Sequence, residues 1–87
     1  MKVKMNGFVN DMGYVESYNE TFEGEGSSIL DVVCDWLMKE RDFGEEDTLN
    51  IKRNVNKGWM VGCEWVLSGN KLECKSDVMT ESFEIID

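Results

Sequence analysis

Residues 28–43 carry a run of apolar side chains that a helix can bury only by packing against another element. At 100° per residue, one broad face of this helix collects Ile29, Leu30, Val32, Val33, Cys34, Trp36, Leu37 and Phe43. Ser27 or Ser28 can cap its start, and Ser28 with Asp31 approximates a capping box. Gly44 can end it. A helix this one-sided needs a second layer, which the rest of the chain must supply.

The segment before the helix predicts a β-hairpin over residues 2–23. Its turn is Asp11-Met12-Gly13, with the glycine where a three-residue loop needs a left-handed residue. This register places Val9 opposite Val15. One face of the hairpin then carries Val3, Met5, Val9 and Val15. The other carries the aromatic residues Phe8, Tyr14, Tyr18 and Phe22, among Lys2, Lys4, Glu16 and Glu20.

The segment after the helix, residues 48–76, predicts a three-stranded meander. Its turns are Asn56-Lys57-Gly58 and Gly69-Asn70, the second of type II′. These turns set two cross-strand pairs, Val55 with Trp59 and Leu67 with Leu72. One face of the meander then holds Leu49, Ile51, Val55, Trp59, Val61, Cys63, Trp65, Leu67, Leu72 and Cys74. Arg53 also falls on this face and does not fit it.

The tail, residues 78–86, predicts a last strand because Met79, Phe83 and Ile85 recur at even spacing. We therefore expect an α+β fold with ββαβββ order. Its two layers are an antiparallel sheet and one amphipathic helix packed on one face. Residues 1–87 are expected to form a single globular domain.

The net charge of −9 is unevenly distributed. Residues 16–47 hold eleven acids against Lys39 and Arg41. The helix dipole stabilises acids near the helix start but not those at 42–47, near the predicted end, so helix stability does not explain them. Acids on the exposed helix side and around both ends form a candidate partner-binding acidic face of Glu23, Glu25, Asp31, Asp35, Asp42, Glu45, Glu46 and Asp47.

The sequence indicates no catalytic residues, metal site or cofactor. It contains no histidine, no P-loop and no GxGxxG motif. The three cysteines, Cys34, Cys63 and Cys74, form no CxxC motif and are expected to be small buried hydrophobic residues. Carboxylates at 20–25 or 42–47 offer oxygen ligands for a hard cation, but neither group has EF-hand spacing, and a solvated acidic loop is the favoured interpretation.

Membrane insertion and direct nucleic-acid binding are both disfavoured. No apolar run approaches 18 residues, and the N-terminal stretch lacks the apolar segment of a signal peptide, so a cytoplasmic protein is expected. Because phosphate contacts dominate affinity for nucleic acid, a chain of net charge −9 is repelled by it.

In size and charge, the chain resembles the small acidic inhibitors that bacteriophages make against nucleic-acid-binding proteins, such as anti-CRISPR proteins and DNA mimics. The resemblance implies a phage or mobile-element protein that blocks a basic nucleic-acid-binding surface stoichiometrically, for example on a CRISPR effector. The alternative is a homo-oligomeric structural or regulatory domain, such as a homodimer. It would use Phe8, Tyr14, Tyr18 and Phe22 as a second interface.

Overall fold

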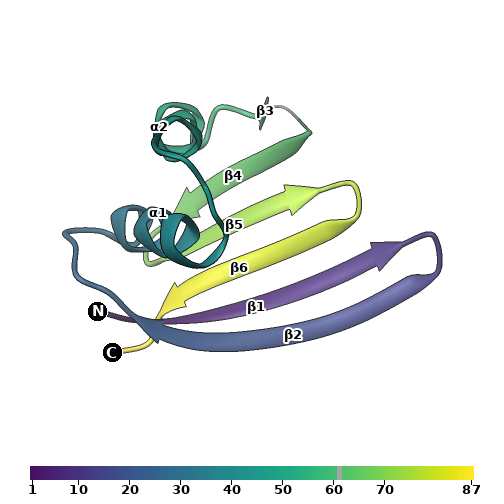
Figure 1. Cartoon of the computed structure of the whole chain (residues 1–87), viewed down its shortest axis with the longest axis horizontal. Helices are drawn as coiled ribbons and strands as arrows, with labels where there is room; N and C mark the ends of the chain where they lie inside the picture. The colour runs from purple at the N-terminus through teal and green to yellow at the C-terminus, as the bar shows by residue number, and fades with distance from the viewer. Residues whose placement is uncertain (61) are drawn as a thin grey trace.

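The computed structural model describes residues 1–60 and 62–87, and in these residues it shows an α+β fold (Figure 1). The elements are, in chain order, β1 (Lys2–Asp11), β2 (Tyr14–Glu23), α1 (Ile29–Glu40), α2 (Glu45–Asn54), β3 (Trp59–Met60), β4 (Cys63–Ser68), β5 (Lys71–Ser76) and β6 (Met79–Ile85). The predicted order with one helix is therefore wrong, because a second helix follows the first. The strands form an antiparallel sheet, as expected.

The strand order in the sheet is β2-β1-β6-β5-β4-β3. The predicted last strand is confirmed as β6, which lies between β1 and β5 and so joins the N-terminal hairpin to the C-terminal strands. The chain ends meet as a result: the Lys2 backbone N–H donates to the Asp87 carboxylate at 2.8 Å. In Figure 1, the turn of the β1–β2 hairpin extends away from the helices.

The hairpin forms, but its predicted register is wrong by one residue. Its turn has two residues, Met12 and Gly13, with φ of 50° and 89°. Positive φ at both positions defines a type I′ turn, which matches the twist of the flanking strands. Val9 therefore pairs with Glu16 rather than with Val15.

This shift moves every β2 side chain to the opposite face of the sheet. Phe22 pairs with the buried Val3, and Tyr18 pairs with Gly7, so both lie on the face that the helices cover. Phe8 lies on the opposite face and is 45% exposed. The four predicted interface aromatics therefore do not share one face.

The first helix forms largely as the sequence predicts. The Ser28 side chain caps α1 by accepting a hydrogen bond from the Asp31 backbone N–H. The predicted apolar arc is its buried face, with Ile29, Val32, Val33, Cys34, Trp36 and Leu37. The helix ends at Glu40, three residues before the predicted boundary. Asp42 then adopts a left-handed φ of 56°, a conformation that Asp tolerates better than most residues.

The first strand of the predicted meander is wrong, because α2 occupies residues 45–54. Val55 caps the end of this helix, so the predicted turn at 56–58 and its Val55–Trp59 pair do not form. Thr48 and Ile51 are the buried side chains of α2, three residues apart as helical packing requires. Arg53, the misfit on the predicted strand, is exposed on the helix.

The charges of α2 favour the helix. Glu45, Glu46 and Asp47 lie in its first turn, and Lys52 and Arg53 lie in its last turn. Each group is placed at the end of the helix dipole that stabilises its charge. Gly44 begins α2 rather than ending α1, and its backbone N–H donates to the Asp47 carboxylate at 2.8 Å.

The second half of the predicted meander is confirmed as β4 and β5. Gly69 has φ of 61° and begins the two-residue turn, which pairs Leu67 with Leu72 as predicted. The register also places Trp65 opposite Cys74, so both lie on the buried face. Val61, which the prediction placed on this face, lies outside the described residues.

An aromatic cluster links the hairpin, the helix layer and β6. The rings of Phe22 and Trp36 stack with centroids 4.7 Å apart. Phe83, which is fully buried on β6, meets Trp36 edge-on at 5.8 Å. Such pairs add stability beyond the area they bury. The cluster fixes the position of α1 over the end of β2.

Candidate functional site

A groove of about 600 Å³ opens between α1, the end of β2 and the segment that joins them. Its lining holds five carboxylates and one ammonium group, with an aromatic pair below them. The lining residues are Glu20, Phe22, Glu23, Gly24, Glu25, Val32, Asp35, Trp36, Lys39 and Glu40. We call this feature the acidic groove.

The stacked rings of Phe22 and Trp36 form the apolar part of the acidic groove. The Arg41 guanidinium lies over the Trp36 ring, 4.9 Å from its centroid. Gly24 lets the chain pass close to α1, because a Cβ there would lie 2.8 Å from the Val32 side chain. The groove therefore has a close-packed base under an exposed, charged rim.

The rim carboxylates make the acidic groove strongly negative. Glu20, Glu23, Glu25, Asp35 and Glu40 are all exposed. Among the described residues, none of these five forms an ion pair within the groove. A concave surface with an excess of one sign of charge, here five carboxylates against Lys39, focuses its electric field and concentrates ions of the opposite sign.

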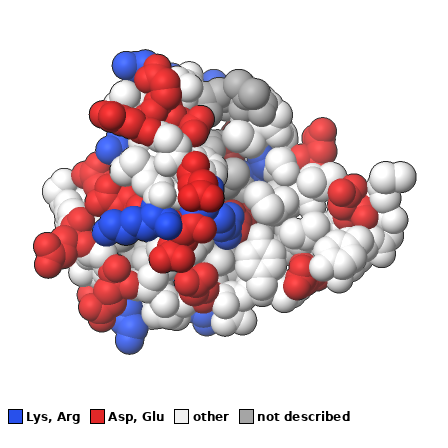
Figure 2. Space-filling model, viewed as in Figure 1, with Lys and Arg blue, Asp and Glu red and all other residues white. Residues whose placement is uncertain are grey.

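The predicted acidic face divides into two regions. Its residues Glu23, Glu25 and Asp35 line the acidic groove, together with Glu20 and Glu40, which the prediction did not include. The other five lie elsewhere, either between the two helices or at the start of α2. In Figure 2, acidic side chains gather over the part of the molecule that Figure 1 labels α1 and α2.

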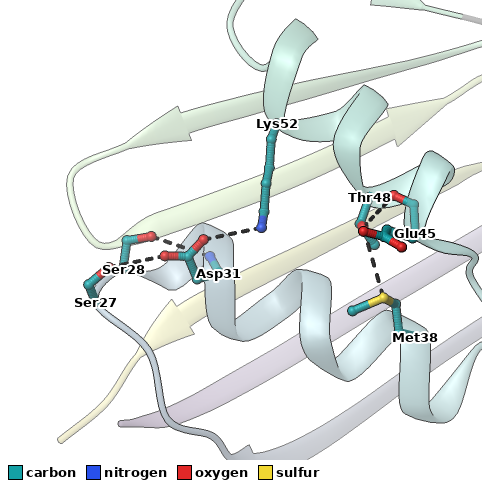
Figure 3. A network of polar contacts seen from close by, with 7 residues as sticks. All are labelled: Ser27, Ser28, Asp31, Met38, Glu45, Thr48 and Lys52. Atoms are coloured by element: carbon teal, nitrogen blue, oxygen red, sulfur yellow. Dashed lines mark hydrogen bonds and ion pairs between the residues drawn. The ribbon is translucent and has the colours of Figure 1, made fainter.

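The Asp31 side chain makes structural contacts with Ser27 and Lys52 (Figure 3). Its carboxylate accepts a hydrogen bond from the Ser27 hydroxyl at 3.1 Å and pairs with the Lys52 ammonium at 3.3 Å. The Ser27 hydrogen bond, supported by Lys52, lowers the pKa of Asp31 below its usual value. Asp31 therefore links α1 to α2 and is less available to a partner.

The acids at 45–47 also have local roles, so the argument that helix stability does not explain them is wrong for Glu45, Glu46 and Asp47. Glu45 and Glu46 complement the dipole at the start of α2, and Asp47 caps its first turn. The Thr48 hydroxyl donates to the Glu45 backbone carbonyl at 2.9 Å and contacts the Met38 sulfur (Figure 3). These acids need no partner to explain them.

A buried polar network below the acidic groove was not predicted. Glu81 is 2% exposed and forms a two-point ion pair with Arg41, at 2.7 and 3.1 Å. The Tyr18 hydroxyl donates to the same carboxylate at 2.8 Å. Burial, together with the Glu81 hydrogen bond, raises the pKa of Tyr18 to about 12.

Gly7 makes this network geometrically possible. It pairs with Tyr18 on one side and with Glu81 on the other, so the Tyr18 side chain must cross β1 above it. A Cβ on Gly7 would lie 2.2 Å from the Tyr18 ring. One sequence signal was available: Glu81 shares the even spacing of Met79, Phe83 and Ile85, and so falls on the buried face of the last strand.

A second cavity, of about 450 Å³, lies between α2 and the sheet and is mostly apolar. It is lined by Phe43, Asp47, Asn50, Ile51, Cys63, Trp65, Cys74, Ser76 and Met79. Cys34 and Cys74 are buried, as predicted for these thiols. Burial raises the pKa of the Cys34 thiol to about 11 and that of Cys74 to about 12.

We therefore expect Cys34 and Cys74 to resist alkylation in the folded protein. At pH 8, a thiol of pKa about 11 is ionised in only about one molecule in a thousand, and the thiolate is the reactive form. Mass spectrometry after brief iodoacetamide treatment should find both unlabelled in buffer and labelled in urea. Equal labelling in the two conditions would contradict their burial.

In the described part of the chain, no helix has the length and apolar character needed to cross a membrane. The described residues also contain no group of three or more Cys, Asp or Glu side chains arranged to hold a metal ion. Comparison of the chain with protein-family models, with curated proteins and with solved structures found no match.

Proposed function

We propose that this chain is a small acidic inhibitor that binds a basic nucleic-acid-binding surface of a target protein and blocks it stoichiometrically, in the cytoplasm of a host cell. The acidic groove is the observation that carries the proposal. Anti-CRISPR proteins and DNA mimics are the functional class that such a protein would join, and a CRISPR effector is one candidate target.

The acidic groove suits arginine and lysine side chains. Carboxylates such as Glu23 and Asp35 offer charge-assisted hydrogen bonds to a guanidinium group, which can engage a carboxylate at two points. Phe22 is half-buried in the lining, so its exposed part can contact the apolar stem of a long basic side chain, whereas the Trp36 ring is buried and already contacts Arg41. Surfaces that bind nucleic acid present these basic side chains in clusters.

The overall charge supports the same kind of partner. A net charge of −9 steers the chain toward a positive surface and repels nucleic acid, with which it would compete for that surface. The proposed contact residues are now Glu20, Glu23, Glu25, Asp35 and Glu40. The acids at 31 and 45–47 are not needed, since the fold itself uses them, and Asp42 does not line the acidic groove.

We expect reversal of the groove charge to abolish capture of the target. The variant Glu23→Lys, Asp35→Lys, Glu40→Lys changes three exposed side chains on the rim. The tagged protein should capture a nucleic-acid-binding protein from the lysate of its source cell at low salt and release it at high salt. The variant should retain about a tenth of this capture or less, because opposed charges now face each other.

The control variant is Asp11→Lys, Asp77→Lys, Glu84→Lys, which changes the net charge equally at three exposed positions outside the acidic groove. It should capture the target nearly as well as the native chain. Equal loss in both variants would show that net charge alone, rather than the groove, governs capture, and would count against the proposed site.

The alternative, a homo-oligomeric domain, is less well supported by the positions of its four aromatic residues. Phe22 packs in the aromatic cluster, and Tyr18 holds the Glu81 carboxylate. Phe8 and Tyr14 are exposed, but on opposite faces of the hairpin. Tyr18→Glu would disturb the buried network itself, so light scattering of the unmodified protein is the better test of self-association.

A further inference from the structure

The free edge of β2 offers a second element of recognition beside the acidic groove. The sheet ends at β2, a strand of ten residues. Met1 and Gly24 form a hydrogen-bonded pair: the Met1 ammonium group donates to the Gly24 carbonyl at 3.1 Å, and the Gly24 N–H donates to the Met1 carbonyl at 3.0 Å. Because bonded pairs alternate along antiparallel strands, the backbone groups that point outward from the edge belong to Val15, Ser17, Asn19, Thr21 and Glu23.

The edge and the acidic groove form one continuous surface. Glu16 and Glu20 lie on the helix-covered side of β2, and Glu20 also lines the acidic groove. A strand added along this edge would run beside Glu16 and Glu20 and reach the groove at the end of β2. On the helix-covered side, successive side chains of that strand would lie alternately directly across from Glu16 or Glu20 and diagonally beside them, across from an aromatic residue such as Tyr18.

We propose, on the basis of the proposed function, that the target inserts an extended segment along β2, with Lys or Arg at alternate positions. Backbone hydrogen bonds to β2 provide the affinity of such strand addition, and alternate side chains provide its specificity. Opposite charges directly across a strand pair stabilise the pair. Basic side chains beside Glu16 and Glu20, with the last one in the acidic groove, satisfy both conditions.

Charge also favours this occupant over a second copy of the chain paired in the register centred on Tyr18. Antiparallel pairing of two β2 strands centred on Tyr18 would place Glu16 of one copy opposite Glu20 of the other. Like charges directly opposite each other destabilise a strand pair, and charged side chains on edge strands discourage self-association. A basic segment removes this repulsion and adds attraction.

The test uses capped ten-residue peptides and amide hydrogen exchange measured by NMR on the full chain. One peptide alternates Lys and Thr, and its matched control has the same composition with all lysines contiguous. The alternating peptide should slow exchange of the Ser17, Asn19 and Thr21 amides. The amides of Tyr18 and Glu20, which face β1, serve as an internal reference. Glu16→Gln with Glu20→Gln should weaken peptide binding about tenfold.

Three outcomes would overturn the inference. Equal protection of these amides by the contiguous peptide would reduce recognition to net charge. If the peptides leave the outward amides unprotected while the target is still captured through the acidic groove, strand addition fails and the proposed function stands. Protection that rises with protein concentration alone would assign the edge to a second copy. The proposed function fails by a different result: the native chain captures no target, or the groove variant captures it equally well.

Discussion

Replacing Phe83 by alanine lowers the free energy of unfolding by about 3–5 kcal/mol, the range measured for large buried aromatic residues. Phe83 is fully buried on β6, and its ring meets those of Phe22 and Trp36 at 6.4 and 5.8 Å. The substitution removes the contact that holds the hairpin, the helix and the middle of the sheet together. Domains of this size have only about 5–15 kcal/mol in total, so much of the stability is lost.

Urea denaturation followed by tryptophan fluorescence measures this effect. Phe8→Ala is the matched control, since Phe8 is 45% exposed on the opposite face of the sheet and its loss should cost less than about 1 kcal/mol. Equal destabilisation by the two substitutions would contradict the position of the aromatic cluster and the hairpin register that creates it.

Arg41→Met should destabilise the protein by about 3 kcal/mol, because it leaves the buried Glu81 carboxylate without its cation. The arginine contributes two hydrogen bonds to Glu81 and a contact with the Trp36 ring. The Tyr18 hydroxyl remains and supplies one neutral hydrogen bond. Urea denaturation at neutral pH measures the loss.

The double variant Arg41→Met, Glu81→Leu is the informative control. Replacing both partners of a buried ion pair with apolar residues is often neutral or stabilising, so this variant should recover most of the lost stability. Arg53→Met, at an exposed arginine of α2, should change stability by less than about 0.5 kcal/mol. A double variant no more stable than Arg41→Met would show that the destabilisation does not come from an unpaired Glu81.

Local sequence patterns predicted the elements for which apolar spacing, capping residues and turn residues all indicate the same structure. The arc of α1 repeats with helical spacing and begins at a capping serine, and the structure follows both signals. The Gly69-Asn70 turn fixed the register of β4 and β5, because few turn types fit that pair of residues. The last strand followed from the even spacing of its apolar residues.

The misassigned segment, α2, carries an ambiguous pattern. Leu49, Ile51 and Val55 fit the two-residue alternation of a strand, but Thr48, Ile51 and Val55 also fit one face of a helix. The acidic first turn and basic last turn favour the helix, and Arg53 contradicts the strand. The hairpin register failed for a different reason: Met12 adopts a left-handed conformation that sequence alone rarely assigns to methionine.

The candidate site could be predicted only in part, because it depends on tertiary contacts. Three of the eight predicted acids line the acidic groove, and the register that brings Glu20 beside them follows from the hairpin turn. The network of Tyr18, Arg41 and Glu81 joins residues up to 63 positions apart, across a glycine. No local pattern encodes that proximity.

The decisive measurement is a titration of this chain into a complex of the captured target with labelled nucleic acid, followed by fluorescence anisotropy. Stoichiometric inhibition through the acidic groove predicts release of the nucleic acid, with an endpoint near one chain per target. The variant Glu23→Lys, Asp35→Lys, Glu40→Lys should release about a tenth as much or less at the same concentration. If the native chain binds the target and the nucleic acid stays bound at saturation, the chain does not occupy the basic nucleic-acid-binding surface, and the proposed function is wrong.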